Sequence, residues 1–151
     1  MAEIAFYHLS NSPLEKVLPL LLQKSLDANK RAVVIASTEE RVDALSSLLW
    51  TAIPESWLPH GSTKDGRPDM QPIWITTRTK NPNQATFLFL TDGASAESLD
   101  GFERCFDLFD GMDEKAVRAA RDRWTTLKDA GHNRTYWKQN EKGKWKEKDS
   151  I

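Results

Sequence analysis

Short apolar segments alternate with amphipathic ones along the first half of the chain, and this alternation limits the possible folds more than any other feature. Residues 3–9 and 31–36 are apolar and partly β-branched, which is typical of strands, and the second resembles a buried strand of a parallel sheet. After each of them, apolar residues recur at helical spacing. Strand–helix–strand–helix order predicts a three-layer α/β/α sandwich with a largely parallel (mixed) sheet and a nucleotide-binding-like topology.

The second half continues with further strands and one long helix. Strands are expected at 73–77 and 86–91, and segment 102–109 is expected to form a short helical turn leading to an edge strand. Residues 61–72, rich in Gly, Pro and charged residues, predict an exposed loop. We expect one α/β/α domain over residues 1–133 and a basic hairpin or tail over residues 134–151, with 134–139 and 144–148 as the two arms.

Helix boundaries are suggested by residues with known capping preferences. Ser12 and Pro13 form a favourable helix start, although Pro19 inside the same run indicates a separate first turn or a kink. Ser37 is expected to cap the second helix, with Glu40 completing a capping box. For the long helix, the expected caps are Asp113 at its start and Gly131 at its end.

Charge is distributed unevenly although the whole chain is nearly neutral. The formal net charge is −1, so the protein as a whole is not marked as a nucleic-acid binder. Residues 113–151 hold 11 Lys and Arg against 7 Asp and Glu, a net of +4, and the rest of the chain is therefore acidic. The lone Cys105 fits a reducing cytosol, and we expect neither a signal peptide nor a membrane span.

The sequence contains few motifs that indicate chemistry. The turn after the first strand lacks glycine, and neither a phosphate loop of the GxxxxGK[ST] type nor a GxSxG elbow occurs. The scattered His and Cys residues lack metal-ligand spacing. Asp107, Asp110 and Asp113 with Glu114 suit either a magnesium ion or strand-end and helix-cap roles. The sequence predicts no catalytic residues, no cofactor and no metal site.

The helix expected at 113–131 carries the most informative surface. Trp124 lies at the shoulder of its apolar stripe, with Arg121 and Lys128 on the solvent side at i−3 and i+4. An aromatic ring between two cations suits a ligand with an apolar end and negative charge, such as an acidic peptide tail or a phosphate with a base. The alternative is a tryptophan that closes the rim of the core beneath long basic side chains.

Several blocks in order resemble the DNA polymerase III chi subunit family. They are AFYHL, LLWTAIPESWLPHG, FDLFDGMDEKAVRAARDRWTTLKDAGHN and the terminal YWKQNEKGKW, which together span essentially the whole chain. The resemblance implies an α/β fold and a non-catalytic subunit in the bacterial cytoplasm. It also implies a role in DNA replication, tying the clamp loader to single-stranded DNA-binding protein (SSB). Such a subunit grips the acidic C-terminal tail of SSB, which ends in an apolar residue and its carboxylate, and contacts single-stranded DNA mainly through SSB.

The family's tail pocket is carried over here onto an arginine followed three residues later by an aromatic residue, Arg121 and Trp124. Arg121 would bind the terminal carboxylate, and Trp124 with Val117 would wall the apolar side chain. Lys128 and Arg118 would attract the acidic residues upstream. The family often has a basic residue directly after the aromatic one, where this chain has Thr125.

A second partner is implied by the same resemblance. The surface around Trp50, Trp57 and Pro59 would contact the psi subunit of the clamp loader or an XPD-like helicase. Two other functions stay open at this level. One is a single-stranded nucleic-acid-binding module that stacks bases on Trp124, Trp137 and Trp145. The other is a small nucleotide-dependent enzyme, which is favoured only by fold class.

Overall fold

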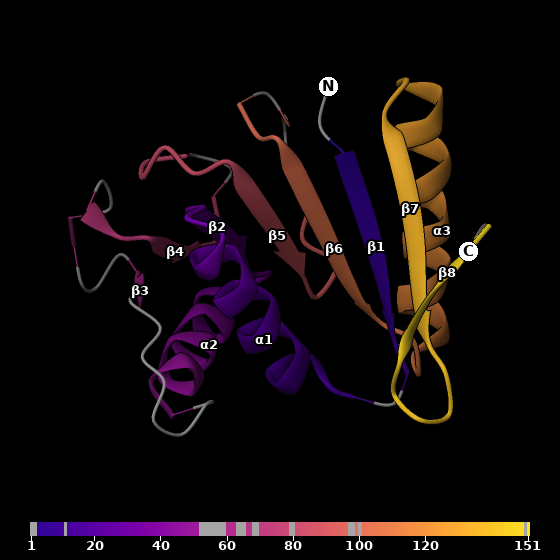
Figure 1. The fold of residues 1–151 in the computed structure, drawn as a ribbon, viewed down its shortest axis with the longest axis horizontal. Coiled ribbons are helices and arrows are strands. Elements are labelled where there is room, and N and C mark those ends of the chain that lie inside the picture. The colour runs from indigo at the N-terminus through magenta and orange to yellow at the C-terminus, as the bar shows by residue number, and fades with distance from the viewer. Residues whose placement is uncertain are drawn as a thin grey trace.

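The computed structural model places one mixed sheet at the centre of the molecule (Figure 1). It describes residues 3–10, 12–51, 60–62, 66–67, 70–78, 81–96, 99, 101–149 and 151, without the side chains of residues 50 and 51. Within these residues eight strands form the sheet, in the order β3-β4-β2-β5-β6-β1-β7-β8. The strands are β1 (Glu3–Leu9), β2 (Ala32–Ile35), β3 (His60–Gly61), β4 (Ile73–Thr76), β5 (Phe87–Thr91), β6 (Arg104–Asp110), β7 (Asn133–Gln139) and β8 (Trp145–Lys148).

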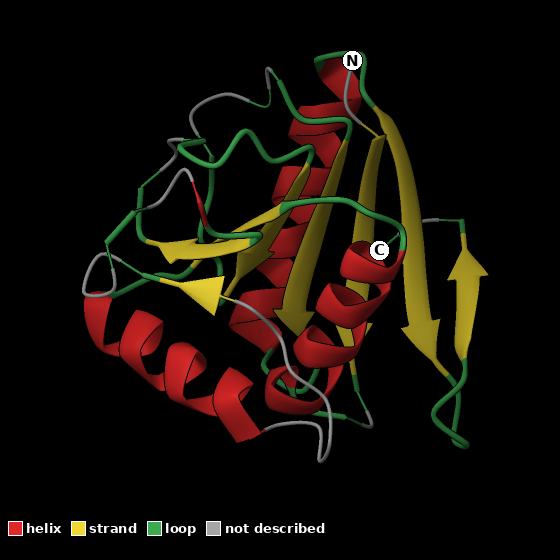
Figure 2. Ribbon diagram, turned by 60° about the vertical axis from the view of Figure 1, so that its left-hand side comes forward, coloured by secondary structure: helices red, strands yellow, loops and turns green. Residues whose placement is uncertain are grey.

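Helices cover both faces of this sheet. Among the described residues they are α1 (Leu14–Asp27), α2 (Glu39–Thr51) and α3 (Glu114–Asp129). α1 and α2 lie together on one face, and α3 lies on the other face, behind β7 and β1 (Figures 1 and 2). Every strand pair is parallel except β7–β8, which is antiparallel. The predicted α/β/α sandwich with a largely parallel, mixed sheet is therefore confirmed.

The core consists of two apolar layers separated by the sheet. Successive side chains of a strand point to opposite faces, so Ala5 of β1 faces the α1–α2 layer whereas Phe6 faces the α3 layer. β2 and β4 are buried along their whole length, as expected for parallel strands covered on both sides. The side chains of β7 alternate in the same way, so Arg134 and Tyr136 face α3 whereas Trp137 faces the α1–α2 layer.

The prediction that segment 102–109 leads to an edge strand is wrong. β6 lies inside the sheet, paired in parallel with β5 on one side and with β1 on the other. Five consecutive residues of β6, from Cys105 to Phe109, are buried. Such a continuous buried run belongs to an interior strand, because an edge strand leaves one row of backbone groups and part of its side chains in water.

Two helix starts differ from the prediction by one residue. Pro13 occupies the position before α1, without a side-chain capping bond, so Ser12 is not the cap. At α2 the Thr38 hydroxyl accepts a hydrogen bond from the Arg41 amide at 3.1 Å, which makes Thr38 the cap in place of Ser37. Because the cap moves, Glu40 no longer stands three residues after it, and the capping box is also wrong.

The remaining local predictions are confirmed in some places and wrong in others. α1 runs unbroken through Pro19, so its first turn is not separate. The Asp113 side chain caps α3, and Gly131 follows the helix with φ 84°, in the left-handed region. The basic segment at the end of the chain forms a hairpin, and its first arm, β7, pairs in parallel with β1. The exposed loop predicted over 61–72 is wrong at its start, because Gly61 belongs with His60 to the short buried strand β3 and Ser62 is also buried.

Candidate functional site: the α3–β7 surface

One flank of α3 presents the residues predicted to bind a peptide. These residues follow each other at intervals of four, three and four, so they form one stripe along the helix: Val117, Arg121, Trp124 and Lys128. Ala120 faces the core and is fully buried. Trp124 and Val117 are half-buried, whereas the Arg121 and Lys128 side chains are exposed, as is Arg118. The predicted residues thus lie together on a partly open surface.

The Trp124 indole is held between aromatic rings and a cation. Its ring meets Phe6 of β1 edge-on, with centroids 5.3 Å apart, and Tyr136 of β7 at 6.3 Å. The Arg134 guanidinium carbon lies 3.9 Å from the indole centroid, and Arg134 Nη1 donates a hydrogen bond to the Trp124 carbonyl oxygen at 2.7 Å. The indole is therefore a half-buried wall of fixed orientation, neither sealed inside the fold nor free on the surface.

Arg134 is the residue of this surface that sequence reasoning missed. Pattern analysis placed Arg121 and Lys128 beside the indole because both share its helix. The structure instead stacks Arg134 on the ring, from the neighbouring strand. The alternation of side chains along β7 is the sequence signal that could have indicated this contact. It places Arg134 and Tyr136 on one face of the strand, and Tyr136 contacts the same indole.

A buried polar pair, His8 and Tyr136, lies next to the Trp124 indole. The Tyr136 hydroxyl and His8 Nδ1 are 2.7 Å apart, and both residues are buried. Burial raises the pKa of Tyr136, and the positive charge of Arg121 opposes that rise. Burial, followed by the nearby Lys138 charge, lowers the pKa of His8, so at neutral pH its imidazole is uncharged. The two rings therefore form a neutral polar contact that orients Tyr136 against Trp124.

Arg121 already has a partner within the chain. Its Nε donates a hydrogen bond to the main-chain oxygen of Ile151 at 3.2 Å. Ile151 is half-buried and packs against the same apolar cluster as Val117 and Trp124. Ile151 therefore lies against α3, whereas Lys148, three residues earlier, is paired with β7. The α3–β7 surface, defined as Val117, Arg121, Trp124, Lys128 and Arg134, thus carries an apolar side chain and an oxygen acceptor from elsewhere in the chain.

An ion pair on the opposite flank fixes α3 to the sheet. Arg123 Nε and Nη2 bind the two oxygens of the buried Asp107 carboxylate at 2.6 Å and 3.0 Å. Burial raises the Asp107 pKa, and the Arg123 bonds oppose that rise. This geometry holds the helix at one rotation, which leaves the Trp124 flank facing β7. Both oxygens of Asp107 are therefore bound to Arg123, and the residue lies within β6 and not at its end.

The magnesium hypothesis gains no support from the remaining carboxylates. Asp110 accepts a bond from the Met112 amide at 2.9 Å, and Asp113 caps α3. Across the described ranges, no group of three or more His, Cys, Asp and Glu side chains is placed to hold a metal ion.

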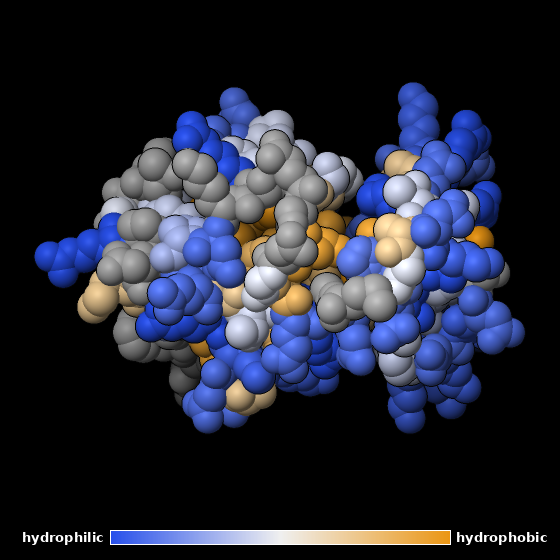
Figure 3. All heavy atoms as spheres, turned by 90° about the horizontal axis from the view of Figure 1, so that it is seen from above, coloured by the Kyte–Doolittle hydropathy of each residue, from blue (hydrophilic) through white to orange (hydrophobic). Residues whose placement is uncertain are grey.

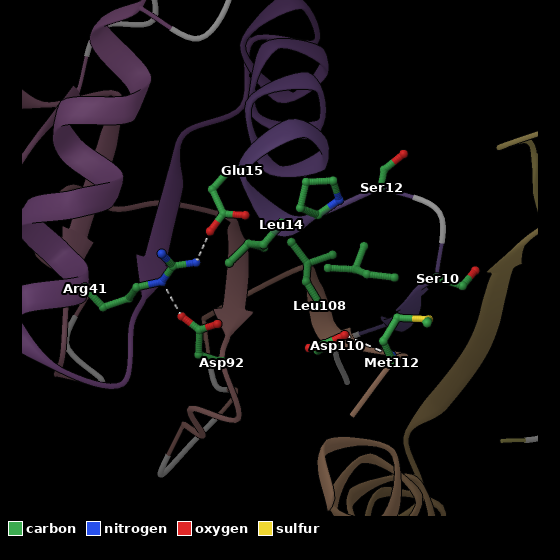
Figure 4. A pocket seen from close by; sticks show the side chains of 11 residues that line it. Ser10, Ser12, Leu14, Glu15, Arg41, Asp92, Leu108, Asp110 and Met112 are labelled. Atoms are coloured by element: carbon green, nitrogen blue, oxygen red, sulfur yellow. Dashed lines mark hydrogen bonds and ion pairs between the residues drawn. The ribbon is translucent and has the colours of Figure 1, made fainter. Parts of the chain in front are cut away.

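A cleft at the carboxyl ends of β1, β5 and β6 occupies the place where α/β folds commonly bind ligands (Figure 4). It has a volume of about 450 Å³. Its one arginine, Arg41, is bound to Glu15 at 2.6 Å and to Asp92 at 2.7 Å. The Arg41 hydrogen bond lowers the Glu15 pKa and keeps that carboxylate charged. An acidic lining with a committed arginine disfavours the phosphate groups of a nucleotide.

The three tryptophans of the nucleic-acid hypothesis do not share a surface. Trp124 belongs to the α3 layer, whereas Trp137 and Trp145 pack against the α1–α2 layer. Trp145 meets Tyr7 edge-on at 5.0 Å on that opposite face. They cannot form one continuous stacking platform. The Trp50 side chain, Trp57 and Pro59, predicted to contact psi or a helicase, lie outside the described residues.

Viewed from above, the part of the molecule built from α3, β7 and β8 is covered mostly by hydrophilic side chains (Figure 3). Apolar atoms gather instead in the hollow between this part and the rest of the molecule (Figure 3). In the described part of the chain, no helix is long and apolar enough to cross a lipid bilayer.

The chain is similar to known proteins. Residues 1–135 match the family model described as DNA polymerase III chi subunit, HolC. A curated relative, named probable DNA polymerase III subunit chi, from Rickettsia prowazekii (strain Madrid E), is 33% identical over 90 residues. That match covers 60% of this chain and 54% of the relative, so it spans about half of the relative's length. The chain belongs to the DNA polymerase III chi subunit family, a family of accessory subunits in DNA replication.

Proposed function

We propose that this protein is a non-catalytic subunit that links the clamp-loader part of the bacterial polymerase to SSB by binding the acidic C-terminal tail of SSB. The family assignment supports a place in the replisome and thus in the bacterial cytoplasm. The observation that carries the proposal is the exposed Arg121 beside the half-buried Trp124 on one stripe of α3. A guanidinium next to an apolar wall suits a peptide that ends in an apolar residue and a carboxylate.

Each residue of the surface has a distinct task in this proposal. Arg121 binds the terminal carboxylate of the tail, and Trp124 with Val117 contacts its apolar side chain. Lys128 and Arg118 attract the acidic residues further upstream, so binding weakens as salt rises. Arg134 adds a fourth cation, which lies directly over the indole. Arg134 supplies, from β7, part of the positive charge that a basic residue at position 125 of the helix would supply.

A peptide titration tests the proposal. We expect an acidic peptide with an apolar last residue and a free carboxylate to bind the wild type, and Arg121→Ala to weaken that binding by about 1.5–3 kcal/mol, the range for hydrogen bonds to charged groups. Arg78→Ala is the matched control, since it removes the same exposed charge near the end of β4, far across the sheet. Unchanged affinity in a folded Arg121→Ala protein would rule out this site.

A second comparison separates peptide-end recognition from general attraction of acidic chains. Amidating the peptide removes the terminal carboxylate and leaves the upstream acidic residues in place. We expect amidation to reduce binding to the wild type strongly and to make little difference in Arg121→Ala. Equal binding of both peptides to the wild type would mean that the surface attracts acidic chains without reading their ends.

A second interface is proposed for the segment that contains Trp50, Trp57 and Pro59. Paired tryptophans next to a proline suit a hydrophobic protein interface, and the expected partner is psi or an XPD-like helicase. Trp57→Ala should abolish co-purification with that partner and leave peptide affinity unchanged. Simultaneous loss of both activities would indicate unfolding instead, which circular dichroism would reveal.

A further inference from the structure

We propose that the residues following β8, Asp149 and Ile151, act as an internal ligand of the α3–β7 surface and compete with an external peptide for it. This inference rests on the proposed peptide-binding function and adds a means of regulating it. The observation behind it is the contact between Arg121 and the Ile151 oxygen, together with the half-buried Ile151 side chain.

The chemistry of this segment resembles that of the proposed ligand. Ile151 supplies an apolar side chain and a main-chain oxygen that accepts a hydrogen bond from Arg121 at 3.2 Å. Asp149 supplies an exposed carboxylate two residues earlier. The proposed external peptide would offer the same three elements: an apolar side chain, an oxygen for Arg121 and upstream acidic groups. Both ligands therefore need the same guanidinium, and both place an apolar side chain on the cluster against which Val117 and Trp124 pack.

The position of β8 means that the contact between Ile151 and Arg121 costs little conformational entropy. Lys148, the last residue of β8, is paired in register with Tyr136 of β7. Tyr136 lies beside Trp124, and the charge of Arg121 reaches its hydroxyl. Ile151 follows only three residues later, and three residues span at most about 10 Å. The hairpin thus delivers Ile151 next to α3, with little loop closure remaining to be made.

The sequence context argues against incidental burial of Ile151. The preceding residues, from Lys146 to Asp149, are all charged and exposed. A single apolar residue after such a run would ordinarily remain in water or be mobile. Here it packs on the same α3-layer cluster as Val117 and Trp124, the residues proposed to receive an apolar side chain.

Competition has a quantitative consequence. A site that is open for only a fraction of the time binds external ligand more weakly by that fraction. If the segment occupies the surface most of the time, its release should tighten external binding by roughly 3- to 10-fold. Because each occupant excludes the other, a bound peptide should also displace Ile151 from Arg121.

The test uses the full chain and an acidic peptide with an apolar last residue and a free carboxylate. We expect Ile151→Ser to bind this peptide roughly 3- to 10-fold more tightly than the wild type. In an Arg121→Ala background the same change should have little effect. Leu20→Ser is the control, because it makes the same kind of apolar-to-polar change without altering charge, at an exposed position of α1 on the opposite face. The control should leave affinity unchanged.

A second measurement follows the segment itself. Amide ¹⁵N relaxation of Ile151 should report an ordered residue in the free wild type and a mobile one after saturation with peptide. Unchanged or weaker peptide binding by Ile151→Ser, or an Ile151 amide that is mobile without peptide, would overturn the inference and leave the proposed function standing. If neither protein binds the peptide, the proposed function fails, and the competition fails with it.

Discussion

The guanidinium of Arg134 stacks on the indole of Trp124 at 3.9 Å, and it also holds the carbonyl of the same residue through a 2.7 Å hydrogen bond. This double contact ties strand β7 to helix α3 at the centre of the α3–β7 surface. It also keeps a positive charge beside an apolar wall, which is the combination that an apolar peptide end with a carboxylate requires.

Replacing Arg134 should therefore affect stability as well as binding. Arg134→Met keeps much of the apolar body and removes the charge and its hydrogen bond, so we expect a loss of about 1–2 kcal/mol in the free energy of unfolding. Urea denaturation monitored by tryptophan fluorescence measures it. Lys138→Met, on the same face of β7 and exposed, is the control and should cost under about 0.5 kcal/mol. Equal effects of the two changes would contradict a specific stacking contact.

The Asp107–Arg123 pair predicts a strongly asymmetric pattern of single and double substitutions. Arg123→Leu leaves a buried carboxylate without a partner, and we expect a loss of about 3–5 kcal/mol at neutral pH. Asp107→Leu together with Arg123→Leu should recover most of this loss, because no unpaired charge then remains buried. Thermal or urea denaturation of the three proteins tests it. A double variant as unstable as Arg123→Leu would show that packing, not charge, dominates.

The same single variant should respond to pH in a defined direction. Burial already raises the Asp107 pKa, and removal of Arg123 raises it further, so the folded state binds a proton more readily than the unfolded chain. The free energy of unfolding of Arg123→Leu then falls as pH rises above the pKa of the carboxyl group in the unfolded chain. It is recovered as pH falls toward about 4. We expect the gap between wild type and Arg123→Leu to narrow on acidification. A gap that is constant between pH 7 and pH 4.5 would contradict this account.

His8 predicts a loss of stability in mildly acidic solution. Burial and Lys138 lower its folded pKa, so the unfolded chain binds more protons just below the ordinary histidine value of about 6.5. Stability contributed by the neutral ring is present above that value and is lost as pH falls toward the folded pKa. Asp110 and the Gly111 backbone act in the opposite sense but do not reverse the shift. His8→Gln should flatten the slope between pH 7 and pH 5.5 in chemical denaturation, and an unchanged slope would exclude His8 as its source.

Gly111 packs against His8 too closely to accept a side chain. A Cβ there would lie 1.9 Å from the His8 ring and 2.9 Å from the Leu9 carbonyl oxygen. We expect Gly111→Ala to cost about 1–3 kcal/mol through overpacking and to disturb Tyr136, the hydrogen-bond partner of His8. A double-mutant cycle with His8→Ala should show coupling, because removal of the ring relieves most of the clash. Additive effects would place the strain at the Leu9 backbone instead.

Much of the fold could be predicted from local patterns. β1 begins and ends where the alternation of apolar residues indicated, and α3 lies between the predicted Asp113 cap and Gly131. These features depend on neighbours within a few residues, so a single stretch of sequence contains their cause. The one-residue errors at Ser12 and Ser37 show the limit of this reasoning, since the position of a helix end varies by one or two residues and does not depend on capping preference alone.

By itself, the sequence determined most of the elements, the fold class and the stripe on α3 that carries Arg121 and Trp124. Only the tertiary structure decided which strands are neighbours, and hence that β6 is interior, that Arg134 covers the indole and that Ile151 reaches Arg121. Periodicity reports which face of an element is apolar but not which element will cover it. That choice depends on the simultaneous packing of all elements against two shared apolar layers, and no short stretch of the chain contains this information.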